Sequence, residues 1–199
     1  MKTCTEDKIN LFKQLFLGLA FVTIAIFSSF YNVLAQDPLD INPNTMNAMN
    51  HGPFVSSTIA YDPRTAGSIV ANKGIAVSLG GNSKAVMVFD TDLLRVASAW
   101  TDGFLYWLPD KRDGLEYWPT PGGVVQFETG KLPGWSLDGD FKDPRTWPYG
   151  PIPKKQGKYK GLYINGDRVL FSYSIGKSEV LETPGLEKIG VHDVFTRTL

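Results

Sequence analysis

Hydrophobic and polar residues alternate along much of the last third of the chain. From Arg168 to Ile175 every second residue is apolar, so one face of this segment is expected to be buried. The residues of that face are Val169, Phe171, Tyr173 and Ile175. Asn165-Gly166-Asp167 and Gly176-Lys177 divide residues 159–183 into three segments, and Asn-Gly is a strong signal for a tight hairpin turn. The pattern predicts three antiparallel strands.

A comparable ladder precedes this one. Ile69 to Leu79 and Lys84 to Asp90 are apolar segments, and the turn sequence Gly80-Gly81-Asn82-Ser83 lies between them. Leu94 to Thr101 is expected to return as a third strand. A helix from Asp92 to Trp100 is the alternative, because Asp92 can cap it and apolar residues follow at helical spacing. The later ladder favours the strand.

The two ladders together predict a mainly β fold of antiparallel meanders, propeller-like or sandwich-like. Their first strands contain Lys73-Gly74 and Lys160-Gly161, which is either a weak internal repeat or a coincidence. Asp193 to Leu199 has the pattern of one more strand, with no turn or polar tail after it. We therefore expect a single β-rich domain over residues 64–199 that is truncated at its C-terminus.

Residues 1–35 have the pattern of a secretory signal peptide. Three lysines precede an uncharged stretch over residues 15–35, and Val33-Leu34-Ala35 suits cleavage before Gln36. The alternative is an uncleaved anchor, because the uncharged stretch is long enough to span a bilayer. In either case the body is exported, to the periplasm or the cell exterior, and a membrane is a partner only if the leader stays uncleaved.

Two Pro-containing segments differ in their aromatic content. Residues 36–63 hold four prolines without periodicity and are expected to be an extended lead-in that packs along an edge. Residues 108–158 hold eight prolines, and all five tryptophans lie between Trp100 and Trp147. Because flexible linkers lack large aromatic residues, which must be buried or used, we expect a long ordered excursion here.

Composition excludes several functions. Twenty Lys and Arg residues balance twenty Asp and Glu residues, so the basic surface of a nucleic-acid-binding protein is not expected. The only cysteine, Cys4, lies in the leader. The exported body therefore has no thiol for a disulfide, a thiolate metal site, a cysteine nucleophile or a covalently attached haem. We expect no intrinsic cofactor.

Three sets of residues are candidates for chemistry. His51 lies in the rigid turn His51-Gly52-Pro53-Phe54 and is either functional or a partner in a turn-stabilising hydrogen bond. Asp90 and Asp92 form an Asp-x-Asp pair that can hold Ca²⁺ or serve a hydrolase, although a pair of turn-forming side chains explains them as well. Four tryptophans are candidates for stacking on sugar rings, or for a satellite aromatic core. They are Trp107, Trp118, Trp135 and Trp147.

Five segments of the chain resemble an uncharacterised domain family. They are His-Gly-Pro-Phe (51–54), Val-Phe-Asp-Thr-Asp-Leu-Leu-Arg-Val-Ala-Ser-Ala-Trp-Thr-Asp-Gly-Phe (88–104), Phe-Lys-Asp-Pro-Arg (141–145), Tyr-Gly-Pro-Ile-Pro (149–153) and Tyr-Lys-Gly-Leu-Tyr-Ile-Asn-Gly-Asp-Arg-Val (159–169). That family occurs near the amino terminus of large exported bacterial proteins described as c-type cytochromes or as membrane-bound, sugar-dehydrogenase-like proteins. The resemblance implies a location and a neighbouring domain, and no catalytic residues.

The sequence and the resemblance together predict an exported, non-catalytic β module of unknown specific function. In a longer relative it would dock against a neighbouring dehydrogenase or cytochrome domain, or orient substrate for it. The alternative is a carbohydrate-binding domain that uses exposed tryptophans. A hydrolase that uses Asp90, Asp92 or His51 remains a third hypothesis.

Overall fold

The computed structural model describes residues 51–199, except residues 64, 82, 108–117 and 137. The expected signal peptide, Cys4 and residues 36–50 of the lead-in lie outside the described residues. The described chain is mainly β, and none of its helices has the length and apolar character needed to cross a membrane. Its elements are β1 (Phe54–Ala60), η1 (Ala66–Ser68), β2 (Ile69–Leu79), β3 (Ala85–Asp90), β4 (Arg95–Thr101), β5 (Leu105–Tyr106), β6 (Thr120–Pro121), β7 (Val124–Glu128), β8 (Gly157–Asn165), β9 (Arg168–Ile175), β10 (Ser178–Ile189) and β11 (His192–Thr198).

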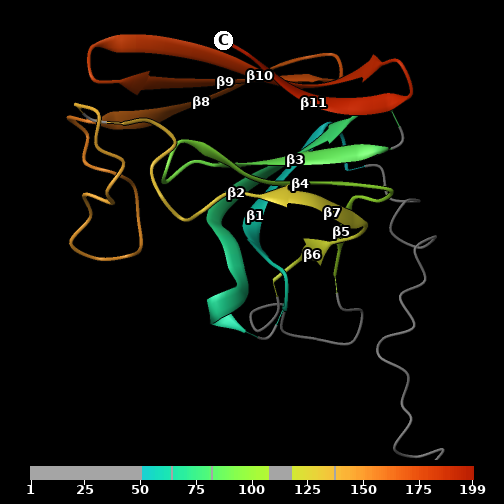
Figure 1. The fold of residues 1–199 in the computed structure, drawn as a ribbon, viewed down its shortest axis with the longest axis horizontal. Helices are drawn as coiled ribbons and strands as arrows, with labels where there is room; N and C mark the ends of the chain where they lie inside the picture. Colours follow the sequence, from blue (N-terminus) through green and yellow to red (C-terminus); the bar gives the residue numbers. More distant parts are fainter. Residues whose placement is uncertain (1–50, 64, 82, 108–117, 137) are drawn as a thin grey trace, which may run out of the picture. The chain divides into compact units, whose positions relative to one another are not determined.

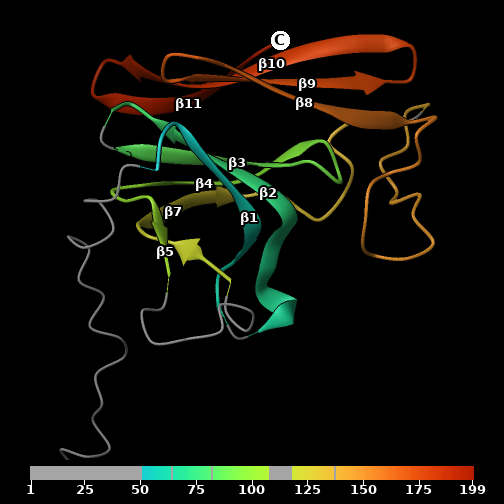
Figure 2. The ribbon, with the colours of Figure 1, turned by 180° about the vertical axis from the view of Figure 1, so that it is seen from behind.

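Two antiparallel sheets form the main layers (Figures 1 and 2). The first sheet has the strand order β1-β2-β3-β4-β7, and the second has the order β11-β10-β9-β8. The short strands β5 and β6 pair with each other in a small third sheet. The prediction of a mainly β, antiparallel fold is confirmed, and its sandwich-like form is the one observed.

The central core lies between the two main sheets. Phe89 of β3 stacks on Phe171 of β9, with the ring centroids 4.3 Å apart, and Tyr173 is also fully buried against this pair. Such an aromatic pair adds about 0.5–1.5 kcal/mol beyond the burial of its area. The core also contains Ile75, Val77, Leu79, Met87, Ala99 and Val169.

The other face of the first sheet is buried as well. Trp100 of β4 is fully buried there, and its indole N–H donates to the carbonyl oxygens of Gly103 and Phe104. The second core includes Ile59, Val70, Val86, Val88, Trp100, Phe104 and Leu105. A strand that is buried on both faces is apolar at successive positions, which explains the unbroken run of apolar residues in β3.

The segment before Trp100 is the strand β4, so the predicted strand is confirmed and the alternative helix is wrong. Leu94 adopts a φ of 51° in the turn that precedes β4. This left-handed conformation is costly for a branched residue, and the complete burial of Leu94 in the central core holds it there.

The second ladder is also confirmed, as strands β8, β9 and β10. β10 has twelve residues and changes partner along its length: residues 178–182 pair with β9, and residues 183–189 pair with β11. Glu182 lies at this change and is completely buried. Its carboxylate accepts a hydrogen bond of 2.5 Å from the hydroxyl of Tyr173 and an ion-paired bond of 2.6 Å from Nε of Arg197. One buried carboxylate thus ties β9, β10 and β11 together.

Two strands lie where the sequence pattern indicated no regular structure. Phe54–Ala60, in the expected lead-in, forms β1 at the edge of the first sheet. Val124–Glu128, in the Pro-rich excursion, forms β7 at the opposite edge of that sheet. Gly123 leads into β7 so close to β4 that a Cβ atom there would lie 1.9 Å from the carbonyl oxygen of Thr101.

The two Lys-Gly segments lie in the first strands of their ladders, but their glycines have different roles. A Cβ atom on Gly74 would lie 3.0 Å from the side chain of Ile59 and 3.2 Å from a β1 carbonyl oxygen. Gly161 has open space around it, lies at an irregularity of the β8–β9 pairing and has a φ of 145°. Close packing requires the first glycine and backbone conformation the second, so the two glycines do not have a common structural role.

Candidate functional site

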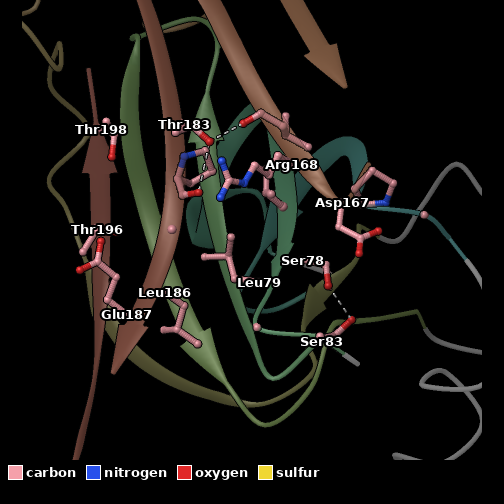
Figure 3. Close-up of a pocket in the computed structure, with 18 of the residues that line it drawn as sticks. Ser78, Leu79, Ser83, Asp167, Arg168, Thr183, Leu186, Glu187, Thr196 and Thr198 are labelled. Carbon is pink, nitrogen blue, oxygen red and sulfur yellow. Dashed lines mark hydrogen bonds between the residues drawn. The ribbon is translucent and has the colours of Figure 1, made fainter. Parts of the chain in front are cut away.

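A groove of about 820 Å³ opens between the two main sheets at one end (Figure 3). We call it the sheet groove. Its wall on the first sheet is formed by the end of β2 and the β2–β3 turn. On the second sheet the β8–β9 turn, β10 and β11 line it. Its volume falls in the usual range for small-molecule sites, about 300–1,000 Å³.

Polar side chains from four parts of the chain converge on the sheet groove (Figure 3). The hydroxyls of Ser78 and Ser83 bond each other at 3.1 Å, and Thr183 donates to the carbonyl oxygen of Val169 at 3.0 Å. Further polar residues along the wall are Asp167, Arg168, Glu187, Thr196 and Thr198. Hydroxyls both donate and accept hydrogen bonds, so this lining suits a polar ligand.

The β2–β3 turn forms one end of the sheet groove because its glycines allow a tight bend. Gly80 and Gly81 have φ values of 74° and 69°, a backbone conformation that residues with a side chain rarely adopt. A Cβ atom on Gly80 would lie 2.9 Å from the side chain of Leu186 on β10. Nearby, Lys84 forms an ion pair of 2.8 Å with Asp193, which links the two sheets.

His51 lies at the margin of the sheet groove. Its ring stacks on Phe104 with the centroids 3.8 Å apart, and Nδ1 lies 3.1 Å from the carbonyl oxygen of Gly52. These contacts match the hypothesis of a histidine that stabilises its turn. The structure also places one imidazole beside a ligand-sized groove, so His51 stays a candidate contact residue.

A second, smaller site lies at the turn between β3 and β4. We call it the charged cavity: it has a volume of about 270 Å³, and its lining includes Asp90, Asp92, Arg95, Asp143, Arg145 and Tyr149. The structure thus places the predicted acidic pair beside part of the Trp/Pro-rich excursion. Among the described residues, no three His, Cys, Asp or Glu side chains are grouped as a metal site would require.

The carboxylate of Asp90 accepts hydrogen bonds within its own turn and forms an ion pair with Arg95. Its Oδ1 accepts hydrogen bonds from the backbone N–H groups of Asp92 and Leu93, and its Oδ2 lies 3.3 Å from a terminal nitrogen of Arg95. Burial raises the pKa of Asp90 and lowers the pKa of Arg95. The attraction between the two charges acts in the opposite direction on each pKa but is the smaller effect. These contacts match the turn-forming interpretation of Asp90.

Asp92 is as deeply buried as Asp90 but has fewer partners. Its Oδ1 lies 3.7 Å from the ammonium group of Lys73, which is largely exposed, and its Oδ2 has no hydrogen-bond partner. Nε of Arg95 is also buried and without a partner, although the terminal nitrogens of Arg95 donate to Thr129 and Val70. One acceptor atom and one donor atom, both buried beside the charged cavity, therefore have no hydrogen-bond partner among the described residues.

An Asp–Arg pair forms the rim of the charged cavity. Nε of Arg145 donates to both carboxylate oxygens of Asp143, and Nη2 donates to Oδ2. Nη1 donates to the carbonyl oxygen of Gly150. These hydrogen bonds hold the pKa of Asp143 below its ordinary value and raise that of Arg145. The pair fixes the conformation of the loop that carries Trp147 and Tyr149.

The four candidate tryptophans lie in different environments. Trp135 packs on the central core beside Tyr173, with the ring centroids 6.2 Å apart, which matches the interpretation as an aromatic core residue. Trp118 is partly buried, and its backbone N–H donates to the carbonyl oxygen of Pro63. Trp107 is 37% exposed and Trp147 is 68% exposed. Of the four, Trp147 offers the most ring surface to a ligand.

The sequence pattern named one residue at the margin of the sheet groove and the acidic pair of the charged cavity. His51 was a candidate, but the threonines of β10 and β11 were not, because nothing local marks a strand hydroxyl that lines a groove. Arg95 and Arg145 were also missed. For Arg95, the available signal was a charged residue at the start of strand β4, five positions after Asp90.

Searches of curated proteins and of solved structures found no significant match to the chain. A scan against family models gave one result. Residues 87–182, from β3 into β10, match the family model described as a domain of unknown function (DUF6797).

Proposed function

We propose that this chain is an exported, non-catalytic β module. In longer relatives it would work beside a dehydrogenase or cytochrome domain, docking against it or orienting substrate for it. The leader pattern and the resemblance found in the sequence support the location and the neighbour. The observation that carries the binding role is the sheet groove, which both sheets line with hydroxyl, carboxylate and guanidinium groups.

The contacts of the candidate catalytic groups support a non-catalytic role. Asp90 is engaged by two backbone N–H groups and Arg95, and the side chains of Asp90 and Asp92 are each 5% exposed. The ring of His51 is stacked on Phe104. A general acid or base must reach its substrate, whereas Asp92 is buried and Asp90 and His51 contact backbone groups of their own turns.

Binding and turnover by the purified full-length chain would test this proposal. The probes are glucose, galactose, xylose and their β-1,4-linked disaccharides, measured by calorimetric titration and by product chromatography with an artificial electron acceptor present. We expect binding without hydrolysis or oxidation. Turnover that Asp92→Asn abolishes, with the thermal midpoint unchanged, would establish a catalytic function instead.

The location of binding is tested with bulky substitutions. Thr198 is exposed at the end of β11 and lines the sheet groove, so Thr198→Trp should fill the groove at little cost to folding. Val191 is 85% exposed in the β10–β11 turn and is absent from the groove lining, which makes Val191→Trp the matched control. Equal affinity in the two variants would show that the sheet groove is not the binding site.

Carbohydrate recognition through exposed aromatic rings is the second candidate function. Trp147 and Tyr149 are 68% and 58% exposed, and their ring centroids lie 6.4 Å apart in a tilted pair. Exposed aromatic faces stack on the apolar faces of sugar rings. Titration of the same sugars should quench or shift tryptophan fluorescence, and the signal should be lost in Trp147→Phe. A spectrum that no sugar alters would count against this function.

A further inference from the structure

Strand β8 forms an uncovered edge of the second sheet. The strand order ends at β8, and no described strand pairs with the side of β8 that faces away from β9. Along its nine residues, Gly157–Asn165, the backbone therefore presents N–H and C=O groups on that side. An edge of this kind is a template for an added strand.

An apolar groove lies between this edge and the first sheet. We call it the edge groove: it has a volume of about 500 Å³ and is lined by residues of β1, β2 and β8 together with Thr91. Lys73 is the only charged residue among its described lining residues. Phe54, Tyr159 and Leu162 line the groove and are only half-buried, so an apolar side chain that enters it would remove their remaining surface from water.

The outer face of β8 is basic. Four exposed lysines lie on the strand or just before it: Lys154, Lys155, Lys158 and Lys160. Side chains alternate along a strand, so Lys158 faces outward while Tyr159 packs on the central core. Lys160 forms an ion pair with Glu179, but the other three lysines form none with any described residue. Residues 144–166 contain no Asp or Glu, so positive charge at this edge is available to a partner.

The lysines decide between the candidate occupants of the edge. Two copies of this chain joined at β8 would bring Lys158 and Lys160 of both chains into one interface, where like charges are destabilising. An extended segment with acidic side chains would instead be attracted. β1, the other strand beside the edge groove, has no charged residue, so the charge selects β8 as the edge to which the segment adds.

We propose that β8 is the docking edge for an extended segment of a partner protein in which acidic and apolar residues alternate. The segment pairs with the free side of β8 through backbone hydrogen bonds. Its apolar side chains enter the edge groove, and its carboxylates lie beside Lys158 and Lys160. Strand addition of this kind takes affinity from the backbone and specificity from pockets for alternate side chains. This inference rests on the docking role proposed above and identifies its surface.

Fluorescence anisotropy with the full-length chain tests this surface. The probe is a labelled peptide of nine residues, the length of β8, in which glutamate and valine alternate. Two comparison peptides have lysine in place of glutamate, or a methyl group on every backbone nitrogen. Both should bind roughly tenfold more weakly than the Glu/Val peptide, because the lysines of β8 repel the first and the second cannot pair with a strand.

Two substitutions at exposed positions test the two faces of the edge. Lys158→Glu replaces an attraction with a repulsion and should weaken binding about fivefold. Lys188→Glu is the control, because Lys188 lies on the part of β10 that pairs with β11. Ser56 is exposed on β1 and lines the edge groove, so Ser56→Trp should fill the groove and weaken binding about tenfold, whereas Val191→Trp should not.

Each contrary result overturns a different part of the proposal. A methylated peptide that binds as well as the Glu/Val peptide would show that the lysines attract any anionic chain, and strand addition would be refuted. Equal affinity in Ser56→Trp and Val191→Trp would remove the edge groove from the site. If the unaltered chain does not bind the Glu/Val peptide, β8 is not a docking edge. The non-catalytic role would still stand, since the turnover measurements decide it.

Discussion

The cluster of Tyr173, Glu182 and Arg197 predicts unequal effects for its two charged members. Glu182 is completely buried, whereas the side chain of Arg197 is 36% exposed. Removing the arginine leaves a carboxylate in the protein interior with Tyr173 as its remaining partner. Removing the glutamate leaves an arginine that can turn to water.

The expected magnitudes follow from this difference in burial. Arg197→Met keeps most of the stem but leaves the carboxylate of Glu182 uncompensated, which is expected to cost about 3–5 kcal/mol. Glu182→Leu leaves the Tyr173 hydroxyl without its acceptor, and a buried hydroxyl without a partner costs about 1–3 kcal/mol. The double variant should be more stable than Arg197→Met alone, because no buried charge remains in it.

Urea unfolding at pH 7, followed by tryptophan fluorescence, measures these differences. Trp135 lies beside Tyr173 and is a suitable reporter of the region. If Glu182→Leu costs as much as Arg197→Met, or if the double variant is the least stable of the three, the assignment of the cost to an unpaired buried carboxylate is wrong.

Three further predictions concern backbone packing and pH. Gly123→Ala should destabilise the protein by on the order of 3 kcal/mol in urea unfolding, because its Cβ atom would lie 1.9 Å from a β4 carbonyl oxygen. Hydrogen bonds from Arg145 hold the pKa of Asp143 below its ordinary value of 3.8. The stability that this pair contributes is therefore present above pH 3.8 and is lost as the pH falls through the lowered pKa, and Asp143→Asn should reduce that acid-dependent loss. Burial and the hydrogen bond to Glu182 raise the pKa of Tyr173 above 10.0. Unfolding free energy should therefore fall as the pH rises above 10, and Tyr173→Phe should weaken that fall.

Each of these predictions has a matched comparison. Gly130→Ala places a Cβ atom where nothing lies within 4 Å, so a loss equal to that of Gly123→Ala would contradict the steric argument. The dependence of the unfolding free energy on pH, on the acid and the alkaline side, is obtained from unfolding measured at several pH values. Identical slopes for the variants and the unaltered chain would show that Asp143 and Tyr173 do not carry the effect.

The strands that were predicted correctly have local signals. In β9 the alternation of apolar and polar residues and the preceding Asn165-Gly166 turn are both visible within ten residues. β7 has no such signal, because all its residues are exposed and it follows a Pro-rich segment. Its position is fixed by pairing with β4, which lies more than twenty residues earlier, and by the tight approach at Gly123.

The sites were harder to predict than the fold because their walls come from distant parts of the chain. Ser78 and Thr196 line one groove although they lie more than one hundred residues apart. Asp92 and Tyr149 both line the charged cavity, and Tyr149 lies on a loop whose conformation depends on the hydrogen bonds of Arg145. Residue type and spacing made Asp92 a candidate but not Tyr149, because only tertiary packing decides which residues share a site.

The change of partner along β10 shows that the limits of the matched family are not the limits of a folding unit. The match ends at Glu182, just where β10 leaves β9 and begins to pair with β11. A fragment cut at residues 87 and 182 would lose Arg197, which neutralises Glu182, and would turn the buried strand β3 into an unprotected edge. Unpaired apolar edges favour aggregation. A domain transplanted between proteins should therefore carry at least residues 54–198.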